Sequence, residues 1–444
     1  MKKFKLRSKE WFDNPDDPGL TALYLERYLN YGLKREDLQS GKPIIGIAQS
    51  GSDLSPCNRH FQALSTTIKD GIREAGGVPM EFPTHPIQET GKRPTAALDR
   101  NLSYLSLVEV LYGYPIDGVI LTTGCDKTTP AALMAAATVN IPSIVLSGGP
   151  MLDGNYKGKK AGSGTIIWEA RKLHAKGEID YDEFMDMAAA SAPSIGHCNT
   201  MGTASSMNSI AEALGMSLPG GAIIPAPYKE RTDISFKTGK RIVEMVFENL
   251  TPSKIMTKAA FENAVYVASA IGASSNCPPH LTAIARHMGI DFNLDQWEKL
   301  GHSIPLLANC QPAGEHLMEG FFKAGGIPAI MKELIKDKKL NIKALTVTGK
   351  TIEENLNMKI DVNRDVIKSY ENPLSHNAGF IVMKSNFFSS AVMKTSVISS
   401  EFRERYLSNK DSLNIFEVKA VVFEGPEDYH ARINDDNLKI DENS

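Results

Sequence analysis

Short strands rich in apolar residues alternate with helical segments in residues 42–150, and this alternation most restricts the fold of the chain. Four strands are predicted, at 42–50, 79–85, 115–124 and 141–150. Helices are predicted between them, because apolar side chains such as Phe61, Leu64 and Ile68 recur at helical spacing. Strands rich in β-branched residues and free of polar alternation are typical of sheets that are buried on both faces. The sequence therefore predicts an α/β fold with a parallel sheet in the N-terminal domain.

The rest of the chain changes character twice. Residues 180–350 are mainly helical in pattern, and 345–374 are polar and form the predicted linker. Residues 375–444 contain three strand-like runs, GFIVMKSN, AVMKTSVIS and NIFEVKAVVFEGP. We therefore expect an N-terminal α/β domain over 1–360, with a helical second part. A β-rich, barrel-like C-terminal domain is expected over 375–444, and we expect it to be incomplete because it is small and ends in a polar stretch.

Three cysteines are each predicted to lie where a strand ends and a helix begins. They are Cys57 in SGSDLSPCNRH, Cys125 in LTTGCDKTTP and Cys198 in SIGHCNTMGTASSMN. A parallel sheet places its strand ends at one edge, where ligands bind, so residues about 70 positions apart can meet there. Three thiolates with one open position are what an iron–sulfur cluster needs to act on a substrate. The pattern favours such a cluster.

Charged residues accompany the second cysteine. Asp126 and Lys127 directly follow Cys125, and Glu89 lies in the loop PIQETGKRP after the second strand. Each has an ordinary alternative: a single cysteine is usually a small buried apolar residue, Asp126 can cap a helix, and Lys127 and Glu89 can be surface charges. Zinc is the competing metal, but structural zinc favours closely spaced ligand pairs, and these cysteines are far apart in sequence.

The composition excludes several classes of function. The formal charge of −3 over 444 residues gives no electrostatic reason to expect nucleic acid or an anionic membrane surface. The five cysteines include no CxxC pair, which argues against a disulfide framework and for a reducing compartment. Cys277 and Cys310 lack polar loop surroundings and are interpreted as structural. No apolar run has transmembrane length, so we expect a cytoplasmic protein.

The chain resembles the dihydroxy-acid and sugar-acid dehydratase family over residues 10–444. The resemblance rests on the following segments: DDPGLTALYLERYLNYGL, IGIAQSGSDLSPCNRH, HPIQETGKRPTAALDRNLSYL, LTTGCDKTTPA, LSGGPMLDG, PSIGHCNTMGTASSMNSIAEALGMSLPG, SSNCPPHLTAIARHMG, NCQPAGEHL and FEGPEDYHARI. Parts of two of these segments, GHCNTMGTAS and HPIQETGKRPTAALDRN, resemble the corresponding segments of the family branch that acts on pentonates such as L-arabinonate and D-xylonate. Ser385 stands where much of the family has glycine.

The resemblance implies specific ligands. It implies that Cys57, Cys125 and Cys198 bind a [2Fe–2S] cluster, and that Glu89 and Asp126 bind Mg²⁺. Lys127 falls on a lysine that is carbamylated in the family and thereby becomes a further oxygen ligand. Carbamylation also removes a positive charge that would repel the cation.

The resemblance also implies a reaction, the dehydration of a sugar acid to its 2-keto-3-deoxy acid. The family's general-base serine lies beyond the position of Ser444, so we expect that serine to be absent from this chain and its own activity to be in doubt. The family further implies a small-molecule substrate and a homo-oligomer, dimer or tetramer.

Three alternatives stay open at this point. One is a dihydroxy-acid dehydratase of branched-chain amino-acid synthesis. Another is a catalytically incomplete fragment that acts as a binding or assembly subunit. The third is an electron-transfer protein, which would need a fourth cysteine ligand that the loops do not offer.

Overall fold

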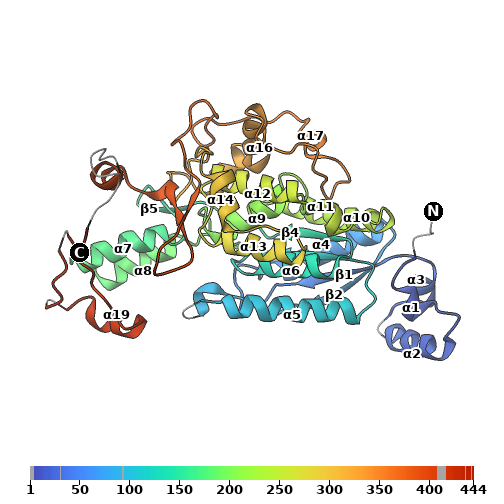
Figure 1. Cartoon of the computed structure of the whole chain (residues 1–444). Helices are drawn as coiled ribbons and strands as arrows, with labels where there is room; N and C mark the ends of the chain where they lie inside the picture. Colours follow the sequence, from blue (N-terminus) through green and yellow to red (C-terminus); the bar gives the residue numbers. More distant parts are fainter. Residues whose placement is uncertain (1–4, 31, 93–94, 408–416, 436, 442) are drawn as a thin grey trace. The chain divides into compact units, whose positions relative to one another are not determined.

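The computed structural model describes residues 5–30, 32–92, 95–407, 417–435, 437–441 and 443–444 (Figure 1). The chain divides into two compact units, Met1–Ser396 and Val397–Ser444. The first unit contains the sheet, the hydrophobic core and all the candidate ligand residues.

Four parallel strands form the central sheet, in the order β2-β1-β3-β4. They are β1 Ile44–Gln49, β2 Val78–Pro83, β3 Gly118–Thr123 and β4 Ser143–Ser147. All residues of β1, β3 and β4 are buried, which agrees with their mainly apolar sequences. The α/β fold class and the parallel sheet predicted from the sequence are confirmed.

The chain reverses its direction across the sheet between β1 and β3. From β1 it passes through α4 (Phe61–Glu74) to β2 at one edge, and then through α5 (Ala97–Gly113) to β3 on the other side of β1. From β3 it continues through α6 (Thr128–Val139) to β4. In such sheets ligands bind at the carboxyl ends of the two strands that flank the reversal. The loops after β1 and β3 are those of Cys57 and Cys125.

Helices cover the sheet closely. One layer contains α4 and α10 (Lys229–Phe247), which contact the strands and cross at Gly71 and Gly239. A Cβ atom on Gly71 would lie 2.2 Å from the carbonyl oxygen of Phe236, so only glycine permits this approach of the two helices. On the other side, α5 packs along α6, and α6 packs on α13 (Cys277–His287) (Figure 1).

The remaining elements complete the first unit. Short N-terminal elements are α1 Lys9–Phe12, α2 Pro18–Leu29, α3 Arg35–Gln39 and η1 Glu89–Gly91. After the sheet come β5 Gly154–Tyr156, β6 Lys159–Ala161, α7 Thr165–Ala175, α8 Tyr181–Ala190, α9 Thr203–Ala213, α11 Pro252–Ile255, α12 Lys258–Ala270, α14 Leu294–Gly301, α15 Met318–Lys323, α16 Gly326–Lys336 and α17 Ile352–Asn355. The helical texture predicted for 180–350 is confirmed.

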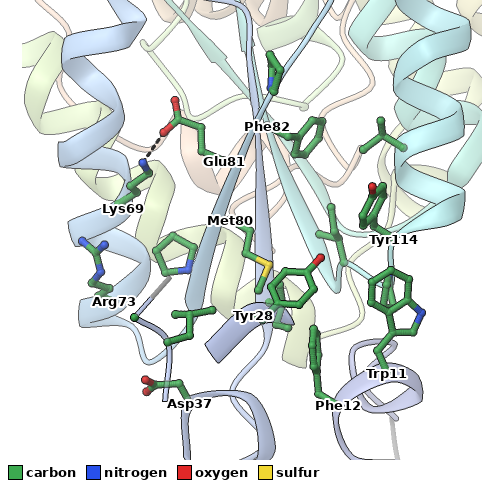
Figure 2. A pocket seen from close by; sticks show the side chains of 18 residues that line it. Trp11, Phe12, Tyr28, Asp37, Lys69, Arg73, Met80, Glu81, Phe82 and Tyr114 are labelled. Atoms are coloured by element: carbon green, nitrogen blue, oxygen red, sulfur yellow. Dashed lines mark ion pairs between the residues drawn. The ribbon is translucent and has the colours of Figure 1, made fainter. Parts of the chain in front are cut away.

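The free edge of β2 is blocked by prolines. Its residues Val78 and Met80 face β1, so Pro79, Glu81 and Pro83 face outward, and two of these three lack an N–H group. A cavity of about 1110 Å³ lies beside this edge, between the ion pair of Lys69 with Glu81 and a cluster of aromatic side chains (Figure 2). The blocked edge prevents another strand from pairing here.

The C-terminal prediction is correct only in part. The runs GFIVMKSN and AVMKTSVIS form the antiparallel pair β7 Phe380–Met383 and β8 Ala391–Lys394. The third predicted strand is wrong over 417–423, which form no strand, and its residues 414–416 lie outside the described part of the chain. Further elements are η2 Thr395–Val397, α18 Ser400–Phe402, η3 Arg403–Leu407 and α19 Pro426–Arg432.

Candidate active site and metal centre

The loops of Cys57 and Cys125 are locked together by a buried asparagine. Asn58 accepts a hydrogen bond from the backbone N–H of Cys125 at 3.0 Å and donates one to Ser50 Oγ at 3.1 Å. A Cβ atom on Gly124 would lie 2.3 Å from Asn58 Oδ1, so the close approach requires glycine before the cysteine. The thiols of Cys57 and Cys125 hydrogen-bond to each other. The structure thus brings these two cysteines into contact.

Cys198 reaches the same place from a different kind of segment. It does not follow a strand, contrary to the prediction; it lies between α8 and α9. The preceding residue, His197, forms one isolated parallel bridge with Pro150, just past the end of β4. Its N–H donates to Gly149 O at 3.0 Å, and its carbonyl accepts from Met151 N at 2.9 Å. The bridge extends the sheet beyond β4. The charge of Cys198 raises the pKa of Cys57, and the charge of Cys125 raises the pKa of Cys198.

A fully buried arginine stabilises the turn after β4, in which the bridge to His197 forms. Arg231 of α10 donates hydrogen bonds to the carbonyl oxygens of Ser147, Gly221 and Ile224. Burial lowers the pKa of Arg231 to about 9, which leaves it charged at neutral pH. Carbonyl groups at the end of β4 and in the segment 221–224 therefore depend on one guanidinium for their hydrogen bonds.

The predicted metal-binding side chains lie beside the cysteines. Lys127 is 3 % exposed, and its Nζ lies 3.3 Å from Glu89 Oε2. Glu89 also accepts hydrogen bonds from Thr95 Oγ1 at 2.8 Å and from Ala96 N at 3.2 Å, at the start of α5. The charges of Lys127 and Glu89 both act on Asp126, and Asp126 acts on the thiols of Cys125 and Cys198. Lys127 and Glu89 are thus in contact, and the charges of Glu89, Asp126 and Lys127 act within the same region as the cysteines.

Burial and mutual contact shift the acidity of these groups. The hydrogen bond between the two thiols raises the pKa of Cys57 well above its usual range, and burial raises it further. The same bond lowers the pKa of Cys125. Burial raises the pKa of Cys198 to about 11 and also raises the pKa of Asp126. A bound cation would lower the pKa of each thiol and carboxyl group that it binds, because thiolates and carboxylates are its ligands.

The donor set fits the implied cofactors in chemical type. Three cysteine sulfurs are suitable iron ligands, and Glu89 and Asp126 offer the oxygens that Mg²⁺ prefers. Within the described residues no group of three or more His, Cys, Asp and Glu side chains has the spacing of a metal site. In the structure the thiol of Cys57 is hydrogen-bonded to that of Cys125, and Lys127 is paired with Glu89. Metal binding would replace these two contacts.

Sequence reasoning missed four polar residues around the site. Asn58 and Arg231 hold the loops, while Arg100 of α5 and the buried His280 of α13 form a partly buried pair joined at 2.9 Å. His280 stands in the run SSNCPPHLTAIARHMG, and a histidine in the first turn of the helix was the available signal.

In the described part of the chain, no helix is both long and apolar enough to cross a membrane.

Comparison with known proteins agrees with this architecture. Residues 42–355 match the N-terminal domain of dihydroxy-acid/6-phosphogluconate dehydratases, and 365–444 match the C-terminal domain. The chain is 58 % identical to a D-xylonate dehydratase of Caulobacter vibrioides over 99 % of this chain and 73 % of the relative. It is 44 % identical to an L-arabinonate dehydratase of Rhizobium leguminosarum over 99 % and 74 % of the two chains.

A third relative comes from another branch. A dihydroxy-acid dehydratase of Halothermothrix orenii is 36 % identical over 90 % of this chain and 72 % of its own. The two domain matches and these identities confirm the resemblance recognised in the sequence. The chain belongs to the dihydroxy-acid/6-phosphogluconate dehydratase family and is a hydro-lyase of the aldonic-acid dehydratase kind.

Proposed function

We propose that this protein dehydrates a pentonate, D-xylonate or L-arabinonate, to the 2-keto-3-deoxy acid. The observation that supports the proposal is that Cys57, Cys125 and Cys198 affect one another's pKa and that Lys127, directly after Cys125, contacts Glu89. The similarity to a D-xylonate dehydratase and an L-arabinonate dehydratase supports the choice of substrate.

We further propose that the three cysteines hold a [2Fe–2S] cluster, and that Glu89, Asp126 and carbamylated Lys127 hold Mg²⁺. When bound, these groups supply Lewis acidity to the hydroxyl that leaves and to the negative charge that develops near the carboxylate. Dehydration takes a proton from C2 and hydroxide from C3, and the resulting enol becomes the ketone. The reaction involves no net oxidation, so it needs no electron-transfer partner.

The chain's own residues hold the Cys125 loop in place and bury it. Asn58 and Asn208 hold the Cys125 loop from both sides, the second by donating to Gly124 O at 3.2 Å. Thr128 Oγ1 accepts from Gly124 N and donates to Cys125 O, so the loop's backbone groups are satisfied without water. Lys127 is almost completely buried. Fixed side chains in a water-poor site interact more strongly with developing charge than they would in water.

Two other functions remain to be tested against this one. The first is dihydroxy-acid dehydratase activity, which the relative from Halothermothrix orenii supports at lower identity. The second is a binding or assembly role without turnover. Both differ from the proposal in what the purified protein does to a pentonate.

The test is a substrate panel. The anaerobically purified, iron-loaded protein is assayed with Mg²⁺ on D-xylonate, L-arabinonate and 2,3-dihydroxyisovalerate, with the 2-keto products measured by NMR. We expect kcat/KM for one of the pentonates to exceed that for dihydroxyisovalerate by about 100-fold or more, because a site built to bond the sugar hydroxyls discriminates strongly against a substrate that lacks them. Preference for dihydroxyisovalerate would support the first alternative, and absence of turnover on all three the second.

We also propose that the protein is a homo-oligomer. The outer surface of α5 carries four exposed apolar side chains at helical spacing, Leu98, Leu102, Leu105 and Tyr112. A stripe of this kind on one helix supports a protein contact, because contiguous apolar surface is otherwise costly in water.

A further inference from the structure

His280 is a buried histidine with one hydrogen-bonding nitrogen unused. It lies in the first turn of α13 and is 4 % exposed. Its Nδ1 is 2.9 Å from Nη1 of Arg100. Its Nε2 is buried and has no hydrogen-bond partner among the described residues. A buried donor without a partner is costly, so this nitrogen calls for an explanation.

The arginine determines which nitrogen carries the proton. A guanidinium has only N–H donors and no acceptor, so the Nδ1 that faces Arg100 must accept and carry no hydrogen. The ring proton is then on Nε2. Burial, together with the charges of Lys127 and Arg100, lowers the pKa of His280 to about 3, so the ring is neutral. The unused atom is therefore an N–H donor of fixed orientation.

The neighbour that can explain this unpaired N–H donor is Lys127. Lys127 directly precedes α6, without a side-chain cap hydrogen bond, and α6 packs on α13, with Thr138 Oγ1 of α6 3.0 Å from His287 Nδ1 of α13. At the opposite end of the same pair of helices, the charge of Lys127 acts on the ring of His280. An ammonium group has three donors and no acceptor, so it cannot satisfy an N–H of His280.

We propose that His280 is a positioning residue whose Nε2–H donates a hydrogen bond to a carbamate on Lys127, with Arg100 holding the ring in the required tautomer. This rests on the proposed function, in which Lys127 is carbamylated. The neutral amine of Lys127 attacks CO₂, an N–C bond forms, one C–O π bond becomes a carboxylate, and one proton leaves to solvent. The product offers anionic oxygens, which is what an unpaired N–H requires.

The expected effect follows from the strength of such a bond. A hydrogen bond to a charged group that is lost on substitution weakens the charged state by about 10- to 100-fold. His280→Leu should therefore raise the CO₂ concentration needed for half-occupancy of the carbamate by that factor. His280→Gln places an amide N–H near the position of Nε2 and should restore most of the occupancy.

The experiment measures the carbamate itself and not turnover. The whole protein and its variants are equilibrated with ¹³C-bicarbonate and Mg²⁺, and the carbamate carbon is counted by ¹³C NMR. His287→Leu is the matched control, because His287 lies on the same helix, seven residues further on, and its ring contacts Thr138 at the other end of α6 from Lys127. Thermal unfolding of each variant shows whether its fold is retained.

The outcomes separate the two proposals. A 10-fold or larger shift in His280→Leu, with near wild-type occupancy in His280→Gln and His287→Leu, supports the inference. Equal occupancy in wild type and His280→Leu overturns the inference and leaves a carbamylated Lys127 in place. A wild-type protein without any carbamate signal overturns the inference together with the proposed role of Lys127.

Discussion

Replacing Lys127 by methionine is expected to lower kcat/KM for the pentonate substrate by about 10³-fold or more. Methionine has a similar length and suits the buried site, but it can neither form a carbamate nor bind Mg²⁺. Removing one preorganised group that stabilises developing charge commonly costs 10²- to 10³-fold, and here the cation would be weakened as well. The measurement is steady-state kinetics at saturating Mg²⁺, with iron content determined on the same samples.

The control for this variant is Lys240→Met. Lys240 lies on α10 and forms a surface ion pair with Glu74 at 2.7 Å, so its loss should leave turnover within about twofold. Iron content should be equal in both variants, because Lys127 is not a cluster ligand in this account. Turnover by Lys127→Met within tenfold of wild type would show that Lys127 is not part of the reacting site.

Replacing Arg231 by methionine is expected to reduce the free energy of unfolding by about 4 kcal/mol or more. The three carbonyl groups that Arg231 satisfies are buried, and each unsatisfied buried group costs about 1–3 kcal/mol. The free-energy change is measured by urea denaturation, with Lys240→Met on the same helix as the control. A loss below about 1 kcal/mol would mean that the turn after β4 holds its shape without the guanidinium.

The position of the site could be predicted from the sequence because it depends on a general property of parallel sheets. Cys57 and Cys125 follow apolar strands, and strand ends in such a sheet share one edge whatever the details of packing. The segments at 44–49 and 118–123 form strands as expected. The strand expected before Cys198 is absent, because the single bridge at His197 has no periodic sequence pattern, and the role of Cys198 as a ligand stays a prediction.

The supporting residues could not be predicted in the same way. Arg231 lies in KERTDISFKTGKR, a run that is typical of an exposed helix. Only the tertiary fold turns its side chain toward the carbonyl groups of Ser147, Gly221 and Ile224, which lie 84, 10 and 7 positions earlier in the chain. The pairing of Arg100 with His280 joins residues 180 positions apart. Helical spacing identifies which residues share a face, but not which face meets which neighbour.

The strand predicted over 417–423 failed for a related reason. The run VKAVVF has high β propensity, but propensity depends on a partner strand against which the side chains can pack. The structure shows these residues without strand pairing, whereas 380–383 and 391–394 pair with each other. Local preference is therefore a weaker guide than the burial pattern that identified the central sheet.

The central claim is that Cys57, Cys125 and Cys198 together hold one cluster, and iron and sulfide analysis of single cysteine variants tests it most directly. Each of the five cysteines is replaced by serine, and iron and acid-labile sulfide per chain are measured after anaerobic reconstitution. We expect about two irons and two sulfides in wild type, Cys277→Ser and Cys310→Ser, and little of either in Cys57→Ser, Cys125→Ser and Cys198→Ser. Full iron and sulfide in all three of the latter variants would contradict the account.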